Sequence, residues 1–396
     1  MNRLKKEPIW TKAFISLFLT NISVFIVFYG LISALPLYAV GALGRTDDEA
    51  GLLMSAFLLS AIFIRPFTGK LLDVAGKRTM LWISLMLYLI CTVLYYFIEP
   101  FGMLLGLRFV QGIWFSIITT AAVSIVADIV PVARRGAGIG YFNMSNNLAV
   151  VLGPLLALYL IQAYSFDVLF IVMSILMVIG VLTSVSAPAD IVRKEKVITK
   201  LAFSDLFEKS AVSIAFLSSL IGFSYASVLS YLSIYAQQKE LLALASTFFL
   251  VFAAVMIITR PYLGDLFDNK GPQYVLIPGF IIFIIGILAL AYMESGYQFL
   301  IAGGLIGFGY GAIIPSLQTL AVQSTKHERS GYATATYFTF YDTGLAIGSY
   351  VLGILALSYS YQVMYIIAAT LVFVVLLGYL WTRRTKRVRG RNGIGE

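Results

Sequence analysis

The sequence predicts an all-α membrane protein with twelve transmembrane helices arranged as two six-helix bundles. Of its 396 residues, 60% are hydrophobic and only 12% are charged, whereas a soluble domain has about 45–50% apolar and about 25% charged residues. Each spanning helix needs about 20 apolar residues, so the chain has room for about twelve of them. A long motif that occurs twice divides these helices into two equal sets. A water-soluble fold is therefore excluded.

The predicted spans follow one another with short connections. Their apolar runs are continuous and lack the polar alternation of a β-barrel strand, so we expect helices. We place the spans at residues 13–40, 50–68, 80–98, 102–126, 137–162, 167–187, 210–237, 243–263, 273–293, 298–323, 332–357 and 362–381.

The repeated motif lies at residues 65–76 and 260–271, an offset of 195 positions. Both copies begin with Arg-Pro and end with glycine. A repeat of this kind indicates a duplicated membrane module, an architecture found in transporters. The same offset relates Arg134 to Arg329, Gly136 to Gly331, Gly112 to Gly307 and Gly153 to Gly348. We therefore divide the chain into an N-terminal bundle (1–187), a charged cytoplasmic linker (188–209), a C-terminal bundle (210–381) and a basic cytoplasmic tail (382–396).

The distribution of lysine and arginine predicts the orientation of the chain. With both termini in the cytoplasm, nearly all basic residues of the loops lie on that side, and only Arg45 and Lys239 lie in loops on the other. The net charge of +9 is then a consequence of topology, and we expect the tail to contact anionic lipid rather than a nucleic acid. No cleavage site follows a short apolar region, so we expect the first span to be retained.

Residues 69–78 connect the second and third predicted spans and read Gly-Lys-Leu-Leu-Asp-Val-Ala-Gly-Lys-Arg. This pattern resembles the signature of the major facilitator superfamily, glycine-x-leucine-x-aspartate-x-x-glycine and two basic residues. We expect the glycines to permit a tight turn and the aspartate to accept charge-assisted hydrogen bonds. The resemblance implies a conformational latch on the cytoplasmic side; the alternative is a loop that sets only topology. The latch residues are Gly69, Asp73, Gly76, Lys77 and Arg78, with Arg134 as a partner and Asp268 in the second copy.

Arg108 lies in the fourth predicted span, within Arg108-Phe109-Val110-Gln111-Gly112. This segment resembles the arginine-x-x-glutamine-glycine pattern of proton-coupled members of the family. An arginine inside a span needs a partner or an aqueous cavity. We predict a role for Arg108 in proton coupling, the alternative being a side chain that extends to the membrane surface.

The fifth predicted span bears on the direction of transport. It resembles in part the glycine-rich pattern of the antiporters in this family, since Gly140 and the pair Gly153-Pro154 match while Ala149, Ala157 and Leu158 replace glycines. We expect Gly153-Pro154 to bend the helix. The partial match favours export over import.

Asp342 lies well inside the span predicted at 332–357, whereas the other acidic residues lie in loops, at termini or at span ends. A carboxylate at that depth is costly when ionised, so its protonation can respond to exposure and to a bound substrate. We predict that Asp342 is the principal proton-coupling residue. The alternative is a carboxyl group that only holds neighbouring helices together.

Amide and tyrosine side chains on several spans are expected to line a central, water-filled substrate cavity. Asn143 and Asn147 are four residues apart and share one helical face. Buried amides need hydrogen-bond partners, and an aqueous cavity supplies them. The other predicted cavity residues are Asn21, Tyr29, Tyr225 and Gln318.

The sequence offers little for chemistry other than transport. Cys91 and His327 are the only residues of their kinds, so they cannot form a metal cage. No phosphate-binding loop, zinc-protease motif or hydrolase nucleophile elbow occurs, and we expect no cofactor and no enzymatic activity. These features point to a membrane protein whose function resides within the bilayer.

The resemblance covers most of the chain and is greatest to the twelve-span bacterial drug:proton antiporters. It implies a cell-membrane exporter of small amphipathic or lipophilic compounds, driven by protons and functional as a monomer. A proton-coupled nutrient importer is the first alternative. A membrane receptor or scaffold of the same fold is the second, and it predicts that loss of the Asp342 carboxylate has no effect on function.

Overall fold

The chain is almost entirely α-helical in the computed structural model, which describes residues 8–45, 47–186, 207–241, 244–326 and 329–392. Twelve helices in these ranges are long and apolar enough to cross a membrane, as predicted. Long apolar runs form helices in lipid because only a helix or a closed barrel satisfies every backbone hydrogen bond there. In chain order the elements are α1 (Lys12–Gly41), α2 (Asp47–Ala75), α3 (Lys77–Leu94), α4 (Phe101–Ile129), η1 (Val132–Arg134), α5 (Arg135–Ala163), α6 (Phe166–Thr183), η2 (Ser184–Ser186), α7 (Lys209–Gln238), α8 (Ala245–Lys270), α9 (Gln273–Ala291), α10 (Gly296–Gln323), α11 (Ser330–Ser358) and α12 (Tyr361–Asn392).

The second and eighth helices are longer than predicted. Helix α2 continues to Ala75 instead of ending at residue 68, and α8 continues to Lys270 instead of residue 263. The prediction that residues 69–78 form a loop is therefore wrong, because most of this segment belongs to α2. In these two connections the chain turns at Gly76 and at Gly271, whose φ angles of 88° and 98° are accessible to glycine at little cost.

Three predicted features fall partly or wholly outside the described residues. Most of the linker predicted at 188–209 lies outside them, and so does His327. The C-terminal tail predicted at 382–396 begins as a continuation of α12, which extends to Asn392.

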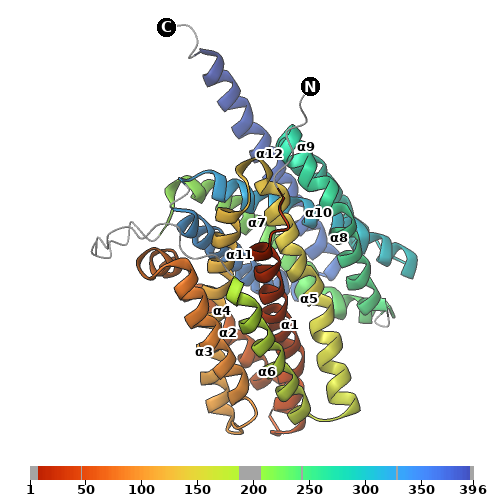
Figure 1. Ribbon diagram of the computed structural model, residues 1–396. Helices are drawn as coiled ribbons and strands as arrows, with labels where there is room; N and C mark the ends of the chain where they lie inside the picture. The colour runs from red at the N-terminus through yellow and green to blue at the C-terminus, as the bar shows by residue number, and fades with distance from the viewer. Residues whose placement is uncertain (1–7, 46, 187–206, 242–243, 327–328, 393–396) are drawn as a thin grey trace. The chain divides into compact units, whose positions relative to one another are not determined.

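The described chain divides into two compact units. The first comprises residues 1–212 together with 318–339, and the second comprises residues 213–317 and 340–396. In the first unit α1 packs on α5 and α6, α2 packs on α4, and α3 packs on α4 and α6 (Figure 1). In the second unit α9 packs on α12 and α8. The first unit thus also contains the end of α10 and the beginning of α11.

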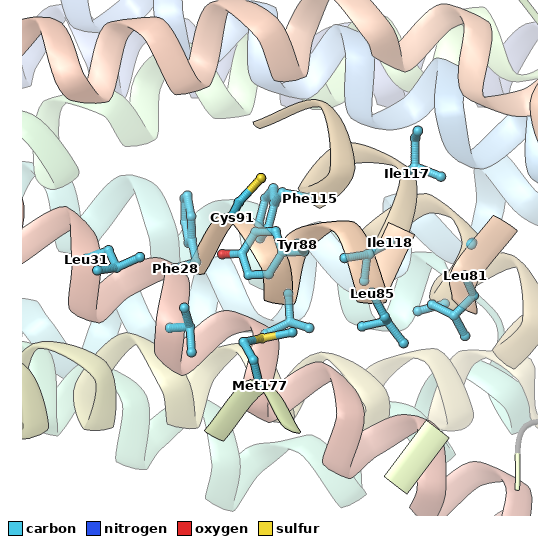
Figure 2. Close-up of a cluster of buried hydrophobic side chains, with 14 of the residues drawn as sticks. Phe28, Leu31, Leu81, Leu85, Tyr88, Cys91, Phe115, Ile117, Ile118 and Met177 are labelled. Carbon is cyan, nitrogen blue, oxygen red and sulfur yellow. The ribbon is translucent and has the colours of Figure 1, made fainter. Parts of the chain in front are cut away.

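The core of the first unit is built from large apolar side chains. Phe28 of α1, Tyr88 of α3, Phe115 of α4 and Met177 of α6 are among its buried members (Figure 2). The rings of Phe28 and Phe115 are stacked with centroids 4.4 Å apart. This cluster joins α1, α3, α4 and α6 to other helices of the unit.

Glycines at helix crossings repeat the same contact in each unit. A Cβ atom at Gly112 of α4 would overlap the carbonyl oxygen of Phe57 in α2, and one at Gly307 of α10 would overlap that of Phe252 in α8. The offset is 195 for both members of the pair (307 − 112 and 252 − 57). Glycine lets two backbones approach this closely because it has no side chain. The duplicated sequence therefore produces a duplicated helix crossing.

Candidate functional site

Arg108 is buried in the first unit, with 1% of its surface exposed. Its Nη1 donates to Oε1 of Gln111 over 2.8 Å, and its guanidinium lies 4.5 Å from the centroid of the Phe57 ring. The Tyr95 hydroxyl donates to the same glutamine oxygen over 2.8 Å. A neutral amide and an aromatic face thus stabilise the charge. This arrangement contradicts the alternative of a side chain that extends to the membrane surface, while the coupling role of Arg108 remains a prediction.

An ion pair joins the predicted latch to the end of α4. Nζ of Lys77 lies 2.6 Å from Oδ2 of Asp128 and donates to Oγ of Ser330 over 2.7 Å. The Ser330 hydroxyl also donates to Oδ1 of Asp128 over 3.2 Å. One lysine therefore links the beginnings of α3 and α11 with the end of α4. Both charged side chains are less than one-fifth exposed, which limits screening by water and salt.

Sequence reasoning missed Asp128 and Ser330 as members of this network. Both lie at helix ends, where polar residues are common, so only their contacts with Lys77 distinguish them. The available signal was the charge of Asp128, which lies just beyond the span predicted at 102–126.

The remaining latch residues lie around the same helix ends. Gly69 permits a close approach of α2 to α11, since a Cβ atom there would lie 2.8 Å from Cα of Tyr332. The Tyr332 hydroxyl lies 3.5 Å from Oδ2 of Asp73. Nη2 of Arg78 donates to the carbonyl oxygen of Val185 over 3.2 Å. Arg134 lies in η1, and Asp268 lies near the end of α8.

A second ion pair connects the segment before α7 with the segment before α11. Arg329 binds Glu208 through its Nε, and the Glu208 backbone N–H donates to Oγ1 of Thr336 over 2.9 Å. Burial raises the pKa of the Glu208 carboxyl group, but hydrogen bonds from Arg329 and Ser210 outweigh it and leave that pKa below its usual range. The pair is therefore intact at neutral pH and is lost only as the pH falls through the lowered pKa.

Two of the predicted cavity residues in the first unit, Asn21 and Asn143, make hydrogen bonds that join α5 to other helices. Nδ2 of Asn143 donates to Oε1 of Gln318 over 2.7 Å. Nδ2 of Asn21 donates to Oγ of Ser145 over 2.7 Å, and Asn21 is only 3% exposed. The Tyr29 ring stacks on Phe25, and Asn147 is half-buried on α5. Asn143 and Gln318 are thus brought together.

The Gly153-Pro154 pair lies inside α5, where this helix crosses α1. A Cβ atom at Gly153 would lie 2.8 Å from Cβ of Tyr29 and 2.9 Å from the backbone nitrogen of Gly30. The glycine is therefore required for close helix contact. The predicted bend at Pro154 stays a prediction.

In the second unit, Asp342 lies near the middle of α11 and is half-buried. The neighbouring Tyr341 hydroxyl is hydrogen-bonded to that of Tyr310 on α10. Tyr225 of α7, a predicted cavity residue, stacks on Tyr310 with ring centroids 4.0 Å apart. Sequence reasoning did not place Tyr310 and Tyr341 among the cavity residues, because tyrosine is abundant in this chain and its pattern alone does not separate a site from the core.

Buried polar and charged residues within spanning helices, and a duplicated six-helix module, define a polytopic membrane protein of the transporter class. The family model of the Major Facilitator Superfamily matches residues 17–297 and 268–395. The chain therefore belongs to the Major Facilitator Superfamily, whose members are transporters of small molecules rather than enzymes.

Related proteins match over almost their whole length. An uncharacterized MFS-type transporter of Methanocaldococcus jannaschii is 25% identical over 383 residues, which cover 94% of this chain and 98% of the relative. The multidrug resistance protein MdtG of Citrobacter koseri is 25% identical over 392 residues, 95% of each chain.

Solved structures support the fold. The human organic anion transporter MFSD10 has a TM-score of 0.79 at 17% identity and covers 92% of this chain and 98% of its own. The transporter FucP in the outward conformation has a TM-score of 0.77 at 18% identity, with coverages of 92% and 97%. These likenesses establish the architecture of a twelve-helix, multi-pass membrane protein.

Proposed function

We propose that this protein is a proton-coupled exporter of small amphipathic or lipophilic compounds that works by alternating access. The observation that carries the proposal is Asp342, a half-buried carboxylate near the middle of α11. At that depth a carboxylate is functional by default, because its ionisation is costly and its charge can respond to a proton or a bound substrate. The relatives named multidrug resistance proteins support export.

In this proposal the chain lies in the cell membrane of a bacterium with both termini in the cytoplasm, and one copy is sufficient for transport. Asp342 takes up a proton from the outer side, the substrate displaces this proton, and the proton leaves to the cytoplasm. Arg108 supplies a fixed positive charge in the N-terminal bundle (1–187). Lys77 links the beginnings of α3 and α11 with the end of α4, and in this proposal these helix ends separate and rejoin in each transport cycle.

The first test measures proton movement in everted membrane vesicles with an acidified lumen and a pH-sensitive dye. Adding a transported compound is expected to release protons from the lumen, because the outer face of these vesicles is the cytoplasmic face. Vesicles without the protein supply the background. A proton-coupled importer would instead take up protons with its substrate in right-side-out vesicles, and that result would overturn the proposal of export.

The Lys77–Asp128 pair gives a second test, directed at the latch. Replacing Lys77 with glutamine removes the ion pair, so the half-buried Asp128 carboxylate loses a charged hydrogen-bond donor. Because a hydrogen bond to a charged group contributes about 1.5–3 kcal/mol, we expect the balance between conformations to shift about tenfold or more and the transport rate to fall. The rate is measured as dye recovery in the same vesicles.

Lys12→Gln is the matched control, since Lys12 is an exposed lysine at the beginning of α1. It is expected to transport at the wild-type rate. Equal rates for Lys77→Gln and Lys12→Gln, at equal amounts of folded protein, would mean that the ion pair has no part in the cycle.

A further inference from the structure

Arg108 in the core of the first unit has no acidic partner among the described residues. Its guanidinium group is hydrogen-bonded to the amide oxygen of Gln111 and to the Tyr95 hydroxyl group, both of which are neutral. The Phe57 ring that it faces is neutral as well. The ion pairs in the described ranges of the chain join other residues. The first unit therefore contains a buried positive charge without a negative charge bound to it.

The Arg108 side chain lies too deep for bulk water to stabilise its charge. It is 1% exposed and belongs to α4, a helix that spans the membrane. Moving an ion out of water costs more free energy than a single hydrogen bond returns, so buried charges are normally paired with an opposite charge. A neutral amide and an aromatic ring offset only part of this cost. A bound anion would offset the remainder.

Two buried polar atoms in this part of the core have no hydrogen-bond partner within the described chain. They are Nε of Arg108 and the hydroxyl oxygen of Tyr88 on α3. Tyr88 has no exposed surface, and its hydroxyl group lies within electrostatic range of the Arg108 charge. The Nε–H group can only donate a hydrogen bond, and the tyrosine hydroxyl group can donate one as well. Both unused groups are therefore suited to an acceptor that carries a negative charge.

Apolar side chains surround these donors. The Phe115 ring lies 6.3 Å from the Tyr88 ring and 5.2 Å from the Phe57 ring. Figure 2 shows Tyr88 among the apolar side chains of this core. Such surroundings strengthen the attraction between a guanidinium group and an anion, because the local dielectric constant is low. An anion enclosed there must be small, and one negative charge is enough to neutralise Arg108.

We propose that Arg108 and Tyr88 form a buried binding site for a small monovalent anion such as chloride. In this site Nε of Arg108 and the Tyr88 hydroxyl group donate hydrogen bonds to the anion, while Gln111 accepts from Nη1. The anion neutralises the charge that Gln111 and Phe57 stabilise only in part. This site goes beyond the proposed transport function and does not depend on it.

The test measures the melting temperature of the purified full-length protein after exhaustive dialysis into gluconate, as chloride replaces gluconate at constant ionic strength. Gluconate is also monovalent but is too large for an enclosed site. We expect the melting temperature to rise saturably, by about 5 °C at a chloride concentration about 100-fold above the dissociation constant. Bromide is expected to have the same effect. Equilibrium dialysis with radioactive chloride is expected to show saturable binding.

Variants assign the chloride effect to the two donors. Arg108→Met removes the charge and is expected to melt at the same temperature in chloride and in gluconate. Tyr88→Phe retains the ring and is expected to weaken chloride binding about tenfold. In gluconate it should melt no lower than the wild type, because it lacks a buried hydroxyl group without a partner. Tyr96→Phe, an exposed tyrosine just beyond the end of α3, is the control and is expected to respond to chloride as the wild type does.

Equal melting temperatures of the wild type in chloride and gluconate would overturn the inference, as would absence of saturable chloride binding. A chloride effect of the same size in folded Arg108→Met would be a general salt effect and would also overturn it. If Arg108→Met does not fold, the wild type and Tyr88→Phe decide the matter. Anion binding needs no proton gradient, so a protein that binds chloride at this site but releases no protons in vesicles would support the site and refute proton-coupled export.

Discussion

Asp342→Asn is expected to reduce substrate-evoked proton release to the level of vesicles without the protein. Asparagine has nearly the shape of the protonated carboxyl group but cannot bind or release a proton near neutral pH. A half-buried residue near the middle of α11 tolerates this neutral substitution more readily than a charge. The variant is therefore expected to fold and to reach the membrane in normal amounts.

A second measurement separates loss of coupling from loss of structure. If substrate and proton compete for Asp342, substrate binding to the purified wild type weakens as the pH falls. The same binding by Asp342→Asn is expected to be independent of pH, because no proton competes. Asp167→Asn, an exposed carboxylate in the first turn of α6, is the control and should keep both proton release and the pH dependence. Wild-type proton release by Asp342→Asn would favour the alternative in which this carboxyl group only holds helices together.

The helices and their number were predictable because hydropathy alone determines which segments span a membrane. The twelve apolar runs needed no knowledge of tertiary contacts, and the repeat at an offset of 195 assigned them to two halves. Helix ends were less predictable. Polar residues such as Lys70 and Asp73 suggested a loop, yet α2 continues through both, since nothing in the segment prevents a helix before Gly76.

The partners of individual polar residues were not predictable from the sequence. Arg108 was expected to need a partner or an aqueous cavity, and the sequence did not show that its contacts are the Gln111 amide oxygen and the Phe57 ring of another helix. Lys77 was expected in the latch, whereas its partner Asp128 lies 51 positions away. Such contacts depend on how neighbouring helices are rotated and displaced along their axes, and hydrophobic periodicity does not fix that geometry.

The glycine crossings lead to the largest expected effect on stability. Gly112→Ala adds one methyl group, and its Cβ atom would overlap the backbone carbonyl of Phe57 and the Ser60 hydroxyl. A backbone atom cannot rotate away as a side chain can, so α2 and α4 must move apart. Overpacking of this kind costs about 3 kcal/mol, and it acts next to Gln111, which holds Arg108. We expect a strong decrease in the yield and melting temperature of monodisperse protein in detergent, measured by size-exclusion chromatography with fluorescence detection.

Helix α4 also provides an internal control, a glycine-to-alanine change that is not expected to lower stability. A Cβ atom at Gly106 of α4 has no neighbour within 4 Å, so Gly106→Ala should leave stability unchanged or raise it by up to about 1 kcal/mol, because alanine favours a helix more than glycine does. Gly307→Ala, the repeat counterpart of Gly112→Ala, is expected to be as destabilising, since its Cβ atom would overlap the Phe252 carbonyl. If Gly112→Ala melted at the same temperature as Gly106→Ala, the crossing of α2 and α4 would be wider than described. If only one of the two counterparts were destabilised, the two units would not share this contact, and the duplicated sequence would have diverged at its closest helix crossing.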